Sequence, residues 1–254
     1  RNRTSPFAFT GNKFEFRMLG PSNSIACANM MLNSAVAESL KIYADRLEQA
    51  EDFGTALHEM IRKTIRDHKK IIFNGNGYDE AWIREATQER GLLNYRTTAD
   101  CMPHLLDPKN VRMLTGHKVF SEAELRSRCE IMLDNYCKTV VIEANTMLDM
   151  ARTQIAPAVA AYTKELCETL ALKRASDAAL ACSWENRMIR RLSALTDQIS
   201  ARQEALEEAL SGLGDAENAE AEACAIRDVV LVRMSELRMA CDEAETLTAK
   251  KYWP

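Results

Sequence analysis

The chain has 254 residues, of which 46% are hydrophobic and 28% are charged, and its formal net charge is −4. A weak, well-mixed negative charge argues against a nucleic-acid partner, whose binding needs concentrated Lys and Arg. No apolar stretch approaches the ~20 residues of a membrane span. We therefore expect a cytoplasmic protein with neither nucleic acid nor membrane as a partner. Because the chain starts at Arg1 without a methionine, we also expect a fragment of a longer protein.

Residues 1–20 carry the pattern of a β-hairpin. Residues 4–9 and 13–18 form two short runs, and the Gly11-Asn12 step between them supplies turn chemistry. In the second run the apolar residues Phe14, Phe16 and Met18 alternate with charged ones. A period of two predicts a strand with one buried face.

Helical periodicity dominates the rest of the first half. Glycine and proline are few, at 9 and 6 residues, and aromatic residues make up only 6%, which favours helix. A turn at residues 20–23 should precede the first helix, whose apolar stripe includes Val36, and Ile61 and Ile65 should mark the buried face of the second. Predicted helices cover residues 24–50, 54–70 and 79–90, followed by an irregular stretch at residues 91–116 with brief helical pieces.

The second half predicts long amphipathic helices. Ser121 and Glu124 form a capping box that begins the first of them, and Pro157 should kink it or restart it. A stop at Gly212–Asp215 precedes the last helix, with Asp215 as its N-cap. Short connections between long helices imply an antiparallel bundle or coiled coil. The apolar stripes comprise Leu125, Cys129, Met132, Tyr136, Val140, Met147, Ala151 and Ile155; then Trp184, Met188, Leu192, Leu195, Ile199 and Leu206; and last Ala223, Ile226, Val230, Leu237, Cys241 and Ala244.

The charged face of the hairpin is the best candidate for chemistry. Strand geometry puts Lys13, Glu15 and Arg17 on one face, about 7 Å apart in succession. A carboxylate between two cations can hold a metal ion while the cations hold anionic oxygens, as phosphoryl transfer requires. Arg1 and Arg3 on the adjoining strand could join this pocket. The alternative is a solvated polar face, which is common in antiparallel sheets.

The other chemically reactive residues form no recognisable motif. The eight cysteines contain no C-x-x-C pair, and we interpret them as small buried hydrophobes in a reducing cytosol. His58-Glu59 starts like a zinc-protease helix, but Arg62 stands where that motif needs histidine. The four histidines are best interpreted as isolated. Gly75-Asn76-Gly77 lacks the lysine and the spacing of a P-loop.

The order of residues in the hairpin resembles the late catalytic strands of the glutamine synthetases. R-N-R-T-S at residues 1–5 and K-F-E-F-R at residues 13–17 look like the family's N-R-S-A-S and R-I-E-x-R-x-P-D segments, and the type III branch in particular. Weaker likenesses follow at residues 91–125, 143–158 and 250–254. The resemblance implies that residues 1–125 end the catalytic domain and that residues 126–254 are a helical extension. The fold class is then mainly α, with a hairpin from the catalytic sheet followed by long antiparallel helices.

The resemblance also implies roles for four residues. Glu15 matches the family's metal-binding glutamate, and Arg17 the arginine that handles glutamate or the acyl-phosphate. Arg3 matches the arginine that faces the ATP phosphates and the transferred group, and Lys13 sits near the nucleotide phosphates. Ala8 departs from the pattern, because most members keep a second ATP-contacting arginine there.

The implied reaction is the ATP-dependent ligation of ammonia to glutamate through γ-glutamyl phosphate, with Mg²⁺ or Mn²⁺ as the cofactor. The remaining ligands should lie upstream of Arg1, so we expect residues 1–254 alone to be inactive. The partners would be glutamate, ammonia, ATP and further copies in a homo-oligomer, a ring-based dodecamer by resemblance. The alternative is a non-catalytic helical module for oligomerisation or partner binding.

Overall fold

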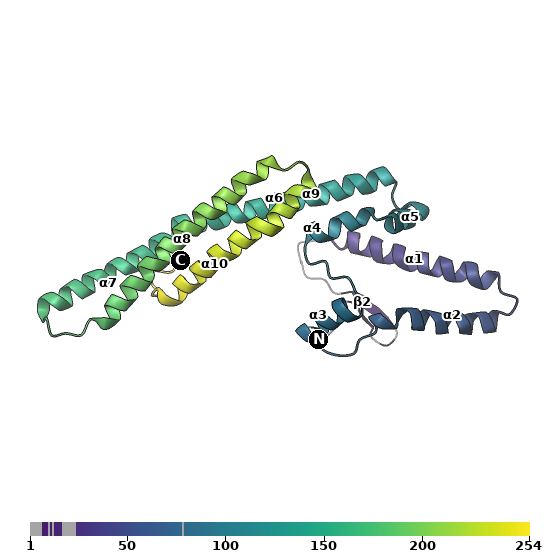
Figure 1. Cartoon of the computed structure of the whole chain (residues 1–254), viewed down its shortest axis with the longest axis horizontal. Helices are drawn as coiled ribbons and strands as arrows, with labels where there is room; N and C mark the ends of the chain where they lie inside the picture. Colours follow the sequence, from purple (N-terminus) through teal and green to yellow (C-terminus); the bar gives the residue numbers. More distant parts are fainter. Residues whose placement is uncertain (1–6, 10, 12, 17–23, 78) are drawn as a thin grey trace. The chain divides into compact units, whose positions relative to one another are not determined.

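The computed structural model describes residues 7–9, 11, 13–16, 24–77 and 79–254. The chain divides into two compact units. The N-terminal unit comprises residues 1–96 and 106–125, and the bundle unit comprises residues 97–105 and 126–254. Long helices dominate both units (Figure 1), which confirms a mainly α fold with a hairpin at its start. The split between a catalytic end and an extension stays a prediction, since packing does not show what each part does.

The N-terminal unit begins with the predicted hairpin. Strand β1 (Phe7–Phe9) pairs antiparallel with β2 (Phe14–Phe16). Gly11 has a φ of 94°, a left-handed conformation that glycine adopts without steric cost, as the predicted turn requires. The turn predicted at residues 20–23 lies outside the described residues.

Helices complete the N-terminal unit. Helices α1 (Ala26–Glu48) and α2 (Phe53–His68) form a helical hairpin, and Asp52 caps α2 by accepting from the Gly54 N–H at 3.1 Å. The irregular stretch contains more helix than predicted, because Pro108 begins a full helix at a position where proline is favoured. The remaining elements are η1 (Lys69–Ile71), α3 (Glu80–Arg84), η2 (Glu85–Glu89) and α5 (Pro108–Gly116), of which α5 packs on α1.

The bundle unit is built around helix α8 (Ser183–Ser211), which packs against α7 (Ala156–Ser176) on one side and α10 (Leu231–Leu247) on the other. Figure 1 shows these helices running side by side in alternating directions. The further elements are α4 (Thr98–Cys101), η3 (Met102–Leu106), α6 (Glu122–Met150), η4 (Ala151–Ile155), η5 (Gly212–Asp215), α9 (Ala219–Ala225) and η6 (Ile226–Val230). Within the described part of the chain, no helix combines the length and apolar character that a membrane crossing needs.

Pro157 restarts the helix without breaking it. Proline has no N–H to donate to the carbonyl four residues earlier. Directly before it, η4 forms one turn of π-helix, whose hydrogen bonds span five residues instead of four. α7 then begins with Pro157 in its first turn, where the missing N–H costs little.

The apolar stripes are confirmed to different degrees. All six residues predicted for the last helix are buried, and so are the four from Leu192 to Leu206 in α8. In the stripe that starts in α6, Leu125, Cys129, Val140 and Ala151 are buried as predicted. The prediction is wrong by one position in the middle of α6, because Leu133 and Cys137 are buried in place of Met132 and Tyr136. Both patterns fit a helical period, and only the positions of the neighbouring helices decide between them.

The start of α8 is a second correction. Trp184 is 48% exposed, whereas the adjacent Glu185 is only 4% exposed. Glu185 accepts a hydrogen bond from the Lys173 ammonium near the end of α7, and this bond holds the pKa of the Glu185 carboxyl below its usual range. A buried carboxylate needs such a partner, so the ion pair fixes which face of α8 turns inward.

The helix caps also differ from the prediction at one end. The capping box at Ser121 is confirmed, with the Ser121 N–H donating to Glu124 Oε2 at 2.8 Å and the Glu124 N–H to Ser121 Oγ at 3.3 Å. Asp215 is not the cap of the last helix. The last helix was predicted to start directly after Asp215, at residue 216, but α9 starts at Ala219. Asn218 is its N-cap, and Asn218 Oδ1 accepts from the Ala221 N–H at 2.9 Å. Asn is as good an N-cap as Asp, so the two were not separable by residue type.

Candidate functional site

The hairpin holds two of the four predicted site residues in the described region. Lys13 precedes β2 and is exposed, and Glu15 is the central residue of β2 and is half-buried. Arg3 and Arg17 lie outside the described residues, as does Arg1. The structure therefore places Glu15 on a strand, as predicted, but it does not test whether the arginines meet it.

The register of the hairpin adds a detail that the sequence did not provide. Glu15 lies directly opposite Ala8, with Phe7 opposite Phe16 and Phe9 opposite Phe14. Directly opposed positions of an antiparallel pair are the closest neighbours across the strands. Position 8, where the resemblance expects an arginine, is therefore the register partner of the predicted metal glutamate.

The faces of β2 do not follow the predicted burial. Phe14 is 61% exposed, although alternation predicts that it is buried. Among the described residues the sheet has two strands, β1 and β2, and two strands alone bury an aromatic face only in part. The N-terminal unit shows the same feature elsewhere, because Val36, Ile61 and Ile65 of the predicted apolar stripes are 52%, 48% and 56% exposed.

A metal ion at Glu15 would need more ligands than the hairpin provides. Hard cations such as Mg²⁺ take about six oxygen ligands, of which one carboxylate supplies at most two. Among the described residues, no group of three or more His, Cys, Asp or Glu side chains is arranged to hold a metal ion. The Glu15 carboxylate has the right donor chemistry, and it fits one part of a site that other residues must complete.

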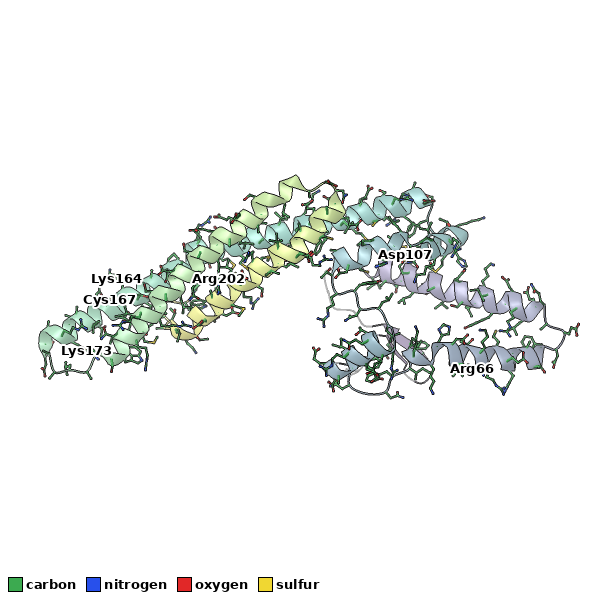
Figure 2. The ribbon with its side chains drawn as sticks, in the orientation of Figure 1. Arg66, Asp107, Lys164, Cys167, Lys173 and Arg202 are labelled. Atoms are coloured by element: carbon green, nitrogen blue, oxygen red, sulfur yellow. The ribbon has the colours of Figure 1, made fainter. Side chains whose placement is uncertain are left out.

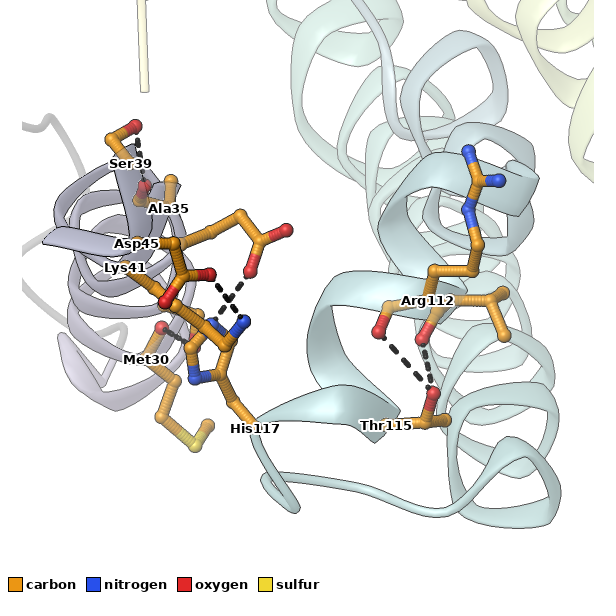
Figure 3. A network of polar contacts seen from close by, with 11 residues as sticks. Met30, Ala35, Ser39, Lys41, Asp45, Arg112, Thr115 and His117 are labelled. Atoms are coloured by element: carbon orange, nitrogen blue, oxygen red, sulfur yellow. Dashed lines mark hydrogen bonds and ion pairs between the residues drawn. The ribbon is translucent and has the colours of Figure 1, made fainter. Parts of the chain in front are cut away.

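A histidine–carboxylate contact joins two helices of the N-terminal unit. His117, just after α5, contacts Glu38 of α1 through Nε2 and Oε2 at 2.8 Å (Figure 3). The prediction that the histidines are isolated is thus wrong for His117. Within α5, Thr115 donates back to the Val111 carbonyl at 2.8 Å. The His117–Glu38 contact therefore links the end of α5 to α1, the helix on which α5 packs.

All eight cysteines are free thiols, of which three are buried, three are exposed, and Cys182 and Cys224 are half-buried. Cys129, Cys137 and Cys241 are buried, as predicted, in the bundle unit. Burial raises the pKa of both the Cys137 and Cys241 thiols to about 11, because a thiolate is poorly solvated there. The prediction is wrong for three cysteines on outward helix faces, which are exposed: Cys27, Cys101 and Cys167.

We expect alkylation to separate these two sets. The thiolate is the reactive form, and a pKa near 11 leaves about a hundredfold less thiolate at pH 8 than a pKa of 9 does. Iodoacetamide at pH 8 should therefore label Cys167 rapidly and Cys137 and Cys241 only after unfolding. Peptide mass spectrometry measures this, and equal labelling rates for Cys167 and Cys241 in the native protein would contradict the burial of the bundle core.

Two polar features of the bundle unit were not found from the sequence. One is the buried Glu185, and the other is a cavity that contains Arg174, Arg187, Arg190 and Arg191. The available signal was the density of arginine in the R-M-I-R-R segment at residues 187–191. Glu185 and the four arginines are all far in sequence from the hairpin of β1 and β2.

Comparison with known proteins gives a consistent family. The family model described as the glutamine synthetase C-terminal domain matches residues 56–174. The chain is 32% identical over 261 residues to a type-3 glutamine synthetase of Dictyostelium discoideum, covering 100% of this chain and 35% of the relative. It is 34% identical to a glutamine synthetase of Butyrivibrio fibrisolvens (99% of this chain, 36% of the relative) and 30% identical to one of Bacteroides fragilis strain YCH46 (100% and 36%).

The extent of these matches defines what the chain represents. It spans about a third of the length of the curated relatives, with 35% to 36% of each covered, while almost all of its own residues are aligned. The matched family model is that of the C-terminal domain, and it overlaps both units of the structure. The chain belongs to the glutamine synthetase family and corresponds to a C-terminal portion of a type III member.

Proposed function

We propose that the protein containing this chain ligates ammonia to glutamate at the expense of ATP, through γ-glutamyl phosphate. The observation that carries this proposal is the similarity, over the whole chain, to three proteins named glutamine synthetase. The chain would contribute one strip of the active site, the hairpin, and not a complete site. The long helices of the bundle unit would form an extension beyond it.

Four residues have proposed roles in this strip. Glu15 would supply carboxylate oxygens to a divalent metal ion. Arg17 would bind glutamate or the acyl-phosphate, and Arg3 would bind the ATP phosphates and the transferred group. Lys13 would add a cation near the nucleotide phosphates. Mg²⁺ or Mn²⁺, when bound, would neutralise negative charge on the phosphate oxygens, and the arginines would add charge-assisted hydrogen bonds.

The surface of the N-terminal unit supports a larger catalytic domain around it. Phe14 on the hairpin, Ile61 and Ile65 on α2, and Leu93 after η2 are between 48% and 71% exposed. Burying such side chains against another part of the protein would contribute about 25 cal/mol for each Å² of apolar surface removed from water. Contacts with the remaining two-thirds of a full-length relative would cover such a surface.

The same proposal includes assembly and location. By family resemblance, the full-length protein would form a homo-oligomer, a ring-based dodecamer, in the cytoplasm. Glutamate, ammonia and ATP would be its small-molecule partners. The bundle unit would lie on the outside of this assembly.

The proposed function is tested by comparing the full-length protein with residues 1–254 alone. We expect glutamine formation from glutamate, ammonia and ATP by the full-length protein, with one phosphate released per glutamine. We expect no measurable glutamine from residues 1–254, because one carboxylate cannot hold the metal ions that the reaction needs. Glutamine formation by residues 1–254 would contradict the partial site. A full-length protein without activity would favour the non-catalytic helical module.

A further inference from the structure

An arginine-lined cavity lies at the α7–α8 end of the bundle unit. Its volume is about 730 Å³, and four arginines line it: Arg174 from the last turn of α7, and Arg187, Arg190 and Arg191 from the first turns of α8. Figure 2 labels Lys173, the residue before Arg174, close to the connection between the two helices. The cavity is formed within one unit and contains no residue of the hairpin strip.

Among the described residues, only one of the four arginines in this cavity has an ion-pair partner. Arg191 forms an ion pair with Glu243 of α10, and Arg174 donates a hydrogen bond to the neutral Asn186 Oδ1, at 3.4 Å. In the described part of the chain, Arg187 and Arg190 have no ion-pair partner. The nearest acidic residue of the same helix turn, Glu185, is buried and already paired with Lys173. Three guanidinium groups therefore lack a carboxylate.

The spacing of these groups is unfavourable without an anion. Arg190 and Arg191 lie three and four residues after Arg187, so the three extend over about 6 Å of helix axis on neighbouring turns. Like charges at these spacings destabilise a helix by a few tenths of a kcal/mol each. The positive end of the α8 dipole adds to the same potential. A ligand with several negative charges would remove this repulsion, whereas a single carboxylate would remove little of it.

An apolar recess adjoins the arginines. A second cavity of about 300 Å³ shares Arg174, Asn186 and Arg190 with the first, and its other lining residues are Cys167, Leu170, Ala171 and Ile189. Cys167 is labelled on α7 in Figure 2. The two cavities form one groove, charged at one end and mainly apolar at the other. The groove is open to solvent, and the four arginines that line it are exposed.

We propose that this groove binds a small organic ligand that carries at least two phosphate groups. The phosphates bind Arg174, Arg187 and Arg190, since guanidinium groups form bidentate hydrogen bonds with phosphate oxygens. The organic part of the ligand lies against Leu170 and Ile189. A nucleic acid is disfavoured, because it would need a long basic surface and the chain is acidic overall, with a net charge of −4.

The test uses the full-length protein, with pyrophosphate and ADP as probes and peptide hydrogen exchange as the readout. Hydrogen exchange locates binding, so occupancy of a catalytic nucleotide site elsewhere does not interfere. We expect both probes to protect residues 167–174 and 183–194, with ADP effective at lower concentration than pyrophosphate. The double variant Arg187→Gln/Arg190→Gln should raise the half-saturating concentration for this protection at least about tenfold.

The matched control is Arg62→Gln/Arg66→Gln, which removes the same charge from an exposed arginine pair on α2. It should leave the protection of residues 183–194 unchanged. The proposal is overturned if neither probe protects these segments in the wild-type protein, or if the α8 variant binds as well as wild type. It is also overturned if the α2 variant loses as much affinity, which would indicate a general charge effect. Equal potency of ADP and pyrophosphate would refute the role of the apolar recess. Unchanged exchange of α8 without ligand verifies that the variant is folded.

Discussion

Replacing Glu15 with alanine in the full-length protein should lower the rate of glutamine formation by about a hundredfold to a thousandfold. Glu15 lies in the middle of β2, half-buried and opposite Ala8, and its carboxylate is the proposed metal ligand. Without this ligand, the metal ion no longer neutralises the transferring phosphoryl group effectively. Initial rates at saturating glutamate, ammonia and ATP measure the effect, and size-exclusion chromatography should show unchanged assembly.

A glutamate outside the strip provides the control. Glu59 is exposed on α2, and Glu59→Ala should keep the wild-type rate within about twofold, since surface changes of this kind are close to neutral. Excess Mg²⁺ or Mn²⁺ should partly restore the Glu15→Ala rate if the defect lies in metal binding. A Glu15→Ala protein with the wild-type rate would remove this residue from the site.

Replacing Leu195 with alanine should destabilise the bundle unit by about 2 to 5 kcal/mol. Leu195 is 0% exposed on α8, the helix that packs against both α7 and α10. The substitution removes buried apolar atoms and leaves a cavity that the two neighbouring helices can close only in part. Native-state hydrogen exchange of α8 and α10 amides in the full-length protein measures the free energy of opening of this unit.

The same substitution at Leu172 is a matched control. Leu172 lies near the end of α7 and is 68% exposed, so Leu172→Ala should change the opening free energy by no more than about 0.5 kcal/mol. The burial pattern of the bundle would be wrong if the two variants had equal effects. It would also be wrong if Leu195→Ala were as stable as the wild-type protein.

The bundle helices show what periodicity can and cannot predict. All six residues predicted for the buried face of the last helix, from Ala223 to Ala244, are buried, and Ala240 joins them without having been predicted. In α6, apolar residues at Met132 and Leu133, and at Tyr136 and Cys137, left two stripes open, and the neighbouring helices select the second. At the start of α8, Trp184 was favoured over Glu185 because a buried carboxylate is predictable only once its partner, Lys173, is known.

The hairpin and the arginine groove also differ in how far the sequence predicts them. Strand pairing and the turn at Gly11 were predictable from residues 7–16, since hairpins depend on local sequence. The exposure of Phe14 was not, because it depends on what covers the strand. The arginine groove could not be predicted from residues 187–191 alone. It requires Arg174 of α7 beside them, and the order of helices in the bundle decides this.

Titration of the full-length protein with Mn²⁺, in wild-type form and as Glu15→Gln, tests the role of the hairpin most directly. Glutamine has nearly the size of glutamate but carries no negative charge. The substitution should therefore keep the fold and weaken the binding of Mn²⁺ by this side chain. Electron paramagnetic resonance of free Mn²⁺ gives the number and affinity of the bound ions. We predict that one class of Mn²⁺ sites loses at least about tenfold in affinity in the variant. Identical binding curves for the two proteins would contradict Glu15 as a metal ligand.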